Sequence, residues 1–299
     1  MKKALIFVTI FSLAYGLTIV VQQSVLRSDF HPLHLNFYIY TLVSLILTAY
    51  MVIFKRQELN LKTLPRKGAA LSALAGIVGI TADILVFYGL THSSSINWGI
   101  IFRLSVLSTF FFSALLLKEK FSPIKILAAA VSIIGAIIIV FKPDWSLSFN
   151  WGDLFFWGAM VSFGLLNVIG QKAMEELSAM QHTYIRMLVG AIILTAVPLF
   201  IFPIREVGPI GIILFNGLAT LVGVVMVSLT IKSAGATFFS IGSNLVVLFV
   251  MIFSVFLLGE WPTILQVIGG LIVVSSIFLF ESGKLKRKDG KPELQVKKT

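Results

Sequence analysis

The sequence predicts an all-α membrane protein with ten transmembrane helices, arranged as two inverted repeats of five helices each. Three observations favour this fold class. The composition is too apolar for a soluble domain, long apolar segments alternate with short polar ones, and the second half of the chain repeats the first. No polar segment is long enough to form a separate soluble domain.

The composition sets the first limits. Hydrophobic residues make up 58% of the chain and charged residues 12%, and the mean hydropathy is +0.98, whereas soluble domains carry about 25% charged residues. The absence of cysteine excludes disulfide frameworks, thiolate metal sites and cysteine nucleophiles. The net charge of +11 does not indicate nucleic-acid binding, because the basic residues lie in short loops and a tail, where topology signals are found.

Ten apolar segments have about the length of 20 residues that a spanning helix needs. They cover residues 4–26, 32–54, 68–90, 95–117, 122–141, 152–174, 180–203, 208–230, 236–258 and 261–281. The first could be a cleaved signal peptide, but it is long and lacks an Ala-x-Ala site. We therefore expect a first five-helix repeat at 1–146, a second at 147–282 and a basic cytoplasmic tail at 283–299.

The distribution of lysine and arginine predicts the orientation. With a cytoplasmic N-terminus, the inner segments hold 19 of the 24 basic residues, the outer loops hold three, and two lie within spans. The opposite topology would invert this bias. We expect both termini to be cytoplasmic.

The internal repeat is clearest at the end of each half. The segment LLLKEKFSPIKILAAAVSIIGAIIIV begins at Leu115, and FLLGEWPTILQVIGGLIVVSSIFLF begins at Phe256, so that Glu119 aligns with Glu260. Upstream, the segment at His34 aligns with the one at His182. Because each half has an odd number of spans, the second half crosses the membrane upside down relative to the first, as in many secondary transporters.

These residues resemble the drug/metabolite transporter superfamily, in particular its ten-helix EamA type. The resemblance covers essentially the whole chain. It is most specific in the repeated Leu-Leu-(Lys/Gly)-Glu motif before a proline-containing turn and in YIRMLVGA from Tyr184 to Ala191. The chain departs from the family at Val106 and Val247, where proline is common. The resemblance implies a secondary carrier, commonly an exporter of metabolites or amino acids, with a central cavity between the halves.

Charged side chains inside spans are functional candidates, because burying a charge in hydrocarbon is costly. Asp83 in the third span and Arg103 in the fourth lie at similar depth, roughly 10–12 Å below the outer boundary at about 1.5 Å per residue. We expect them to form a charge pair facing the central cavity, where they would bind a substrate that carries both charges. A purely structural ion pair is the alternative.

Five further polar residues are candidates for substrate binding: Tyr15, Asn97, Arg186, Asn216 and Asn244. Arg186 would bind an anionic group, or its side chain would extend to the lipid headgroups. The asparagines would hydrogen-bond a ligand or hold helices together. Asn244 aligns with Arg103 in the repeat.

Glu119 and Glu260 are expected to be structural. Each precedes the start of a helix, where an acidic group is favourable, and Ser122 with Pro123 is typical of an N-cap followed by the first helical residue. The histidines lack the spacing of a metal site, and the chain contains no nucleotide-binding or hydrolase motif. We expect no metal, no cofactor and no catalytic residues.

The sequence thus predicts a secondary active transporter, by resemblance an exporter, that moves a small polar metabolite such as an amino acid by alternating access. Its partners would be the substrate and membrane lipid, with a homodimer left open, in the cytoplasmic membrane of the cell. Asp83 is the deep acid available for a proton role. Two alternatives are a membrane-embedded lipid-modifying enzyme, which would need a cluster of polar ligands at one interface, and a non-transporting membrane scaffold, which would need no mirrored polar residues.

Overall fold

The structure is a computed structural model that describes residues 2–26, 32–59, 64–93, 95–140, 150–200, 210–259 and 261–285. Every regular element in these ranges is a helix, which confirms the all-α class. Glu260 and residues 286–299 of the predicted tail lie outside the described residues.

The helices follow one another with short connections. Their bounds are α1 Lys2–Leu26, α2 Pro32–Phe54, the 3-10 helix η1 Arg56–Leu59, α3 Arg66–His92, α4 Ser95–Arg103, α5 Ser105–Leu116, α6 Pro123–Val140, α7 Asp153–Ala173, α8 Ala179–Phe200, α9 Ile210–Ala234, α10 Ala236–Gly242, α11 Leu245–Leu258 and α12 Ile264–Leu285.

The described helices have the length and surface of a membrane protein. Seven helical segments are long and apolar enough to cross a bilayer, and two shorter ones, Pro123–Ile139 and Ile264–Phe280, are also apolar. Large apolar side chains remain outside the bundle: Phe256 and Trp261 are 80% and 83% exposed. Extended apolar surface of this kind is rare on soluble monomers, so lipid is the solvent that fits it.

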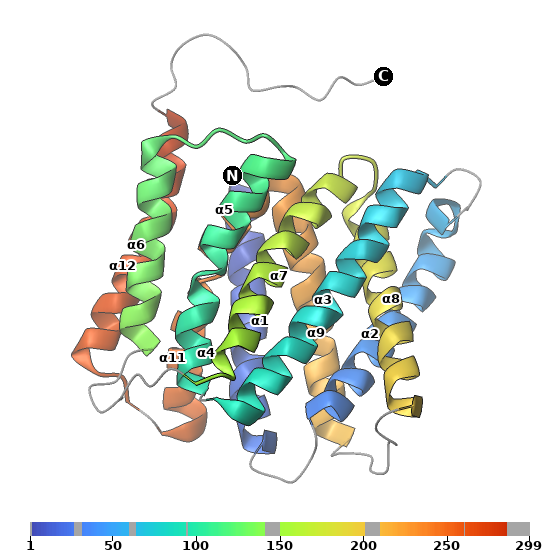
Figure 1. Cartoon of the computed structure of the whole chain (residues 1–299), viewed down its shortest axis with the longest axis horizontal. Helices are drawn as coiled ribbons and strands as arrows, with labels where there is room; N and C mark the ends of the chain where they lie inside the picture. The colour runs from blue at the N-terminus through green and yellow to red at the C-terminus, as the bar shows by residue number, and fades with distance from the viewer. Residues whose placement is uncertain are drawn as a thin grey trace.

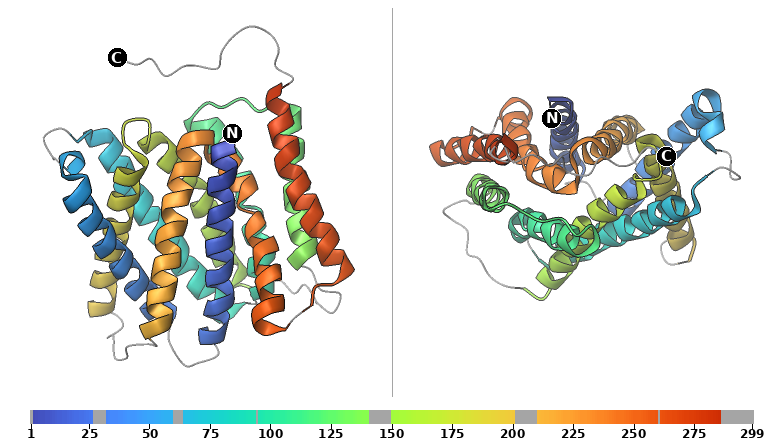
Figure 2. Two further views of the ribbon diagram at one scale, coloured as in Figure 1. Left: turned by 180° about the vertical axis from the view of Figure 1, so that it is seen from behind. Right: turned by 90° about the horizontal axis from the view of Figure 1, so that it is seen from above.

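The helices run up and down in one bundle (Figure 1). One side is formed by α3 to α7 and the opposite side by α1 and α9 to α12, with α2 and α8 at one end and the pair α6 and α12 at the other (Figure 2). The bundle is packed chiefly through α6 on α12, α3 on α7 and α1 on α9. Helix α1 begins, and helix α12 ends, on the same face, which is uppermost in Figure 1.

Several helices begin where the sequence supplies a cap. Ser122 Oγ accepts a hydrogen bond from the Lys125 N–H at 3.4 Å, and Pro123 is the first residue of α6, as predicted. Helix α12 begins after Thr263, whose hydroxyl accepts from the Gln266 N–H at 3.2 Å while Gln266 Oε1 accepts from the Thr263 N–H at 2.9 Å. This reciprocal arrangement satisfies N–H groups that have no partner within the helix.

Two of the predicted helices are broken in the middle. The predicted span 95–117 is divided into α4 and α5 at Leu104, and the span 236–258 into α10 and α11 at Ser243 and Asn244. At both breaks a backbone hydrogen bond joins residues three apart, which makes a tighter turn than that of an α-helix. The Leu104 N–H donates to the Ile101 carbonyl at 3.0 Å, and the Asn244 N–H donates to the Ile241 carbonyl at 3.2 Å. Interrupted helices place backbone and polar side chains in the interior of many transporters.

Candidate functional site

Asp83 lies near the middle of α3, among polar groups from two other helices. Its Oδ2 accepts a hydrogen bond of 2.8 Å from the Tyr40 hydroxyl of α2. Arg186 of α8 reaches the same part of α3, since a side-chain carbon built on Gly79, one turn before Asp83, would lie 3.9 Å from Arg186 Nε. The acid is therefore flanked by a phenol and has a guanidinium nearby.

Arg103 occupies the break between α4 and α5 and is 8% exposed. Its Nη1 donates to Asn244 Oδ1 at 3.3 Å, and its Nε donates to the Gly99 carbonyl at 3.3 Å. The guanidinium carbon lies 4.9 Å from the centre of the Phe102 ring, a cation–π distance. Arg103 and Asn244 thus join the two broken helices directly.

The network continues from Asn244 into α6. Asn244 Nδ2 donates to Ser132 Oγ at 2.8 Å, and the Ser132 hydroxyl donates to the Ile241 carbonyl at 3.3 Å. Both residues are buried. This chain of hydrogen bonds holds Asn244 with its Oδ1 directed at Arg103.

Tyr15 of α1 lies within range of the charges of Asp83, Arg103 and Arg186. Its side chain keeps 37% of its surface exposed, and its ring stacks on Phe11 with centroids 5.4 Å apart. We use the name charged cluster for Tyr15, Tyr40, Asp83, Arg103 and Arg186; it contains two guanidinium groups and one carboxylate.

The expected ion pair between Asp83 and Arg103 is wrong. Among the described residues, Arg103 donates its hydrogen bonds to Asn244 and Gly99, whereas Asp83 accepts from Tyr40. The reason is packing: α3 lies mainly against α7 and α8, while α4 lies mainly against α7 and α6. Equal depth on consecutive helices does not make them nearest neighbours.

Asn97 lies in a different network, where α7 begins. Its Nδ2 donates to both carboxylate oxygens of Asp153, at 3.1 and 3.0 Å, and to Ser93 Oγ at 3.3 Å. The Ser93 hydroxyl and the Asn150 N–H also donate to Asp153, the latter at 2.9 Å. The buried carboxylate is therefore held by the ends of α3, α4 and α7, and the protein itself satisfies the Asn97 amide.

Asn216 and Glu119 are also separate from the charged cluster's hydrogen bonds. Asn216 is fully buried in α9, where its Nδ2 donates to the Ile212 carbonyl at 2.9 Å and its Oδ1 has no hydrogen-bond partner among the described residues. Glu119 accepts a 3.0 Å hydrogen bond from Gln171 Nε2, and Gln171 Oε1 accepts from the Ala236 N–H at 2.5 Å. Glu119 thus links the α5–α6 turn, through Gln171 of α7, to the start of α10.

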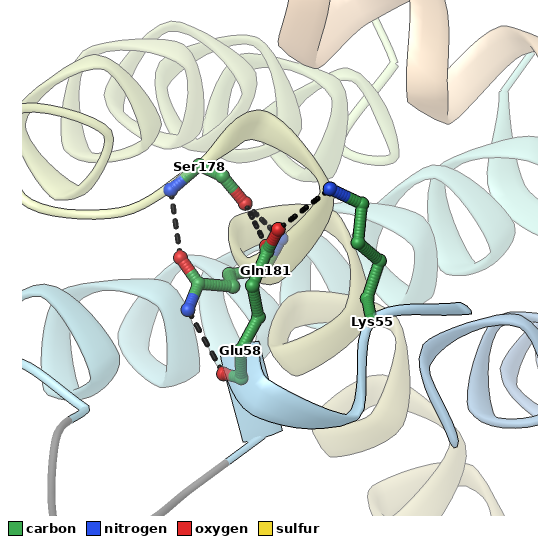
Figure 3. Close-up of polar contacts among 4 residues, drawn as sticks. All are labelled: Lys55, Glu58, Ser178 and Gln181. Atoms are coloured by element: carbon green, nitrogen blue, oxygen red, sulfur yellow. Dashed lines mark hydrogen bonds and ion pairs between the residues drawn. The ribbon is translucent and has the colours of Figure 1, made fainter. Parts of the chain in front are cut away.

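A polar cluster joins η1 to the start of α8 on the face where α1 begins (Figure 3). Glu58 forms an ion pair of 2.9 Å with Lys55 and accepts a 2.8 Å hydrogen bond from the Ser178 hydroxyl. These two contacts, that with Lys55 first, hold the pKa of Glu58 below its usual value, and the Glu58 carboxylate raises the pKa of Lys55. Gln181 Nε2 donates to the Glu58 carbonyl at 2.9 Å.

The model of the EamA-like transporter family matches residues 2–141 and again residues 150–281. The chain belongs to this family. EamA-like proteins are transporters, so the chain is a multi-pass membrane transporter and not an enzyme.

Relatives and a solved structure agree with this assignment. The uncharacterized transporter YyaM of Bacillus subtilis (strain 168) is 28% identical over 234 residues, which cover 74% of this chain and 75% of YyaM. The pseudopaline exporter CntI of Pseudomonas aeruginosa is 27% identical over 234 residues, covering 74% and 78%. One solved crystal structure shares the fold: its TM-score is 0.77 at 15% sequence identity, and the match covers 96% of this chain and 99% of the chain in that structure.

Sequence reasoning missed Tyr40, Ser132 and Asp153. Tyr40 lies directly after Tyr38 and Ile39, the positions that align with Arg186 in the repeat, and this proximity was a usable signal. Asp153 begins a span, where an acid is expected to favour the helix dipole. Ser132 has no signal in the sequence, because a serine in a membrane helix usually bonds its own backbone.

Proposed function

We propose that this EamA-family transporter is a secondary active carrier that exports a small polar metabolite bearing both charges, such as an amino acid. It works by alternating access between two inverted five-helix repeats, residues 1–146 and 147–282, in the cytoplasmic membrane. The charged cluster carries this proposal, because a carboxylate bonded to Tyr40 and two guanidinium groups occur in the membrane-spanning part of the molecule, where burying a charge is costly.

The chemistry of the cluster suits a substrate with an amino and an acidic group. Asp83 would accept hydrogen bonds from an ammonium group, replacing the one from Tyr40. Arg103 and Arg186 would bind a carboxylate through planar guanidinium groups. Because each substrate contact replaces one that the protein makes with itself, binding would change the relative stability of the two access states, as coupling requires.

Mirrored features support the inverted repeat. Arg103 and Asn244 are 141 residues apart, the spacing of the repeat, and each lies at the break of its helix. Lys118 and Gly259 have the same separation, and both have a positive φ, 55° and 69°. The packing is mirrored too, since α3 on α7 corresponds to α9 on α1, and α5 on α7 to α11 on α1.

The direction of transport rests on the relatives. CntI is named as an exporter of pseudopaline, and 27% identity over 234 residues makes export the favoured direction here. The identity is too low to transfer that substrate. Membership of the family excludes both the lipid-modifying enzyme and the non-transporting scaffold.

The test begins with a substrate. Purified protein is screened by thermal shift against amino acids and related zwitterions, and uptake of each stabilising compound is measured in proteoliposomes. Asp83→Asn should lower transport and affinity about tenfold or more, since a charged hydrogen bond is worth about 1.5–3 kcal/mol. Arg103→Lys should be partly active because it keeps the charge but not the planar fork.

The control is Glu175→Gln, which changes an exposed acid beyond the end of α7 and should transport normally. All variants must elute as single species from size exclusion, so that loss of folding is separated from loss of transport. Normal transport by Asp83→Asn combined with Arg103→Gln would refute the site. Failure of every compound to be transported by folded wild-type protein would refute a substrate that bears both charges.

A further inference from the structure

An apolar groove lies between α5 and α6, and no residue of the charged cluster is among those that line it. It has a volume of about 530 Å³, within the range of roughly 300–1,000 Å³ of ligand pockets. Its walls include Leu107 and Phe110 from α5 and Ala129 and Ile133 from α6, and every lining residue is Leu, Phe, Ala or Ile. A groove without a polar group cannot orient a polar metabolite, so its ligand is a hydrocarbon chain.

The groove opens to the outside of the bundle, where lipid lies. Leu107, Ile126 and Ile134 on its rim are 53–55% exposed. It extends from Leu104 to Ala114 along α5. Ten residues at about 1.5 Å per residue give about 15 Å, which is half of the hydrocarbon thickness of about 30 Å. This depth matches the acyl chain of a lipid in one leaflet.

Basic residues lie at the end of the groove nearest the turn between α5 and α6. Phe121 lines that end, and the exposed Lys118 and Lys120 precede it in the turn between α5 and α6. Lys125, in the first turn of α6, lies 5.5 Å from the centre of the Phe280 ring. With Glu119 counted, residues 118–125 carry a net charge of +2.

We propose that the α5–α6 groove is a binding site for one anionic phospholipid, whose acyl chain occupies the groove while its phosphate contacts Lys118 and Lys120. The two parts of the ligand are specified separately: the apolar walls require a chain, and the lysines at the end of the groove require a negative headgroup. Basic residues at a membrane surface attract anionic lipids with about 1 kcal/mol each. The site is independent of the transported substrate.

The experiment uses full-length protein in detergent with added phosphatidylglycerol or with phosphatidylcholine of the same acyl chains. Melting temperature and native mass spectrometry report binding, because a ligand that binds the folded state stabilises it. We expect phosphatidylglycerol to raise the melting temperature more than phosphatidylcholine. Lys118→Gln with Lys120→Gln should weaken phosphatidylglycerol binding about tenfold or more and leave phosphatidylcholine binding unchanged.

Two further variants separate the groove from general charge attraction. Ala130→Phe places a ring in the groove at an exposed alanine and should reduce binding of both lipids. Arg66→Gln with Lys67→Gln removes two exposed charges at the start of α3, on the same face of the bundle, and should keep the preference for phosphatidylglycerol.

Three results would overturn the proposal. Equal stabilisation by the two lipids would remove the headgroup specificity. An equal loss in the Arg66/Lys67 control would show that surface charge alone attracts the lipid. Light scattering that shows a wild-type dimer and an Ala130→Phe monomer would assign the groove to a second copy of the chain.

Discussion

At the scale of single residues, the sequence predicts which side chains matter better than it predicts what they touch. Charges in apolar spans are conspicuous because they are costly, so Asp83, Arg103 and Arg186 were identifiable. Their partners depend on which helices pack together, and that is decided by side-chain shape over many turns. For this reason the sequence suggests Arg103 as the partner of Asp83, although the hydrogen-bond partner of Asp83 is Tyr40 and Arg186 lies beside the preceding turn of α3.

The network around Asp153 leads to a prediction at this scale. Asp153→Ala removes the acceptor for the buried Asn97 amide, and an unsatisfied buried donor costs about 1–3 kcal/mol. We expect a lower melting temperature and an unchanged substrate dissociation constant for the protein that remains folded. Glu175 is an exposed acid in the same half of the chain, and the control variant Glu175→Ala should have the melting temperature of the wild type.

The same measurement decides the role of Asn97, which the sequence placed in the substrate site. If Asn97→Ala weakens substrate binding at least as strongly as Asp83→Asn while the melting temperature stays the same, the structural interpretation fails. A fall in stability without a change in affinity would support it.

At the scale of elements, local chemistry predicts where helices begin, because a cap acts over one turn. Ser122 and Pro123 were recognised for this reason, and Ser178 with Gln181 forms the same kind of signal before α8. The breaks at Leu104 and Asn244 were not predicted. No proline or glycine marks Leu104, and the few polar residues at each break lie within long apolar segments, so hydropathy alone predicts one helix in each case.

Ser178 gives a prediction for an element. Its hydroxyl accepts from the Gln181 N–H at 3.1 Å and donates to Glu58 at 2.8 Å, so it both caps α8 and attaches η1. Ser178→Ala should lower the stability by about 0.5–2 kcal/mol, measured as a lower melting temperature. The Ser233 hydroxyl donates to two carbonyls of its own helix, those of Leu229 and Thr230, so the control variant Ser233→Ala should have little effect on the melting temperature. Equal losses in the two variants would contradict the capping role.

At the scale of the whole molecule, the repeat explains why the family resemblance and the packing agree. Two segments of the chain match one family model, and equivalent helices make equivalent contacts in the two halves. A sequence offset of 141 is enough to pair Arg103 with Asn244, but the sequence does not show that the two side chains meet. The proposed inverted repeat accounts for this contact, because residues near a pseudo-twofold axis contact their own counterparts.

The topology of the whole chain gives the last prediction. Helix α1 begins and helix α12 ends on one face of the bundle, and α6 ends on the opposite face (Figure 1). The face where α1 begins and α12 ends should be cytoplasmic, because this orientation places 19 of the 24 basic residues on the inner side of the membrane. A reporter fused at Gly283 should be active in the cytoplasm, and one inserted in the 143–150 connection should be active outside. A third reporter after Lys120 should agree with Gly283. Matching compartments for 283 and 143–150 would contradict the ten-span arrangement, because five crossings have to separate these positions.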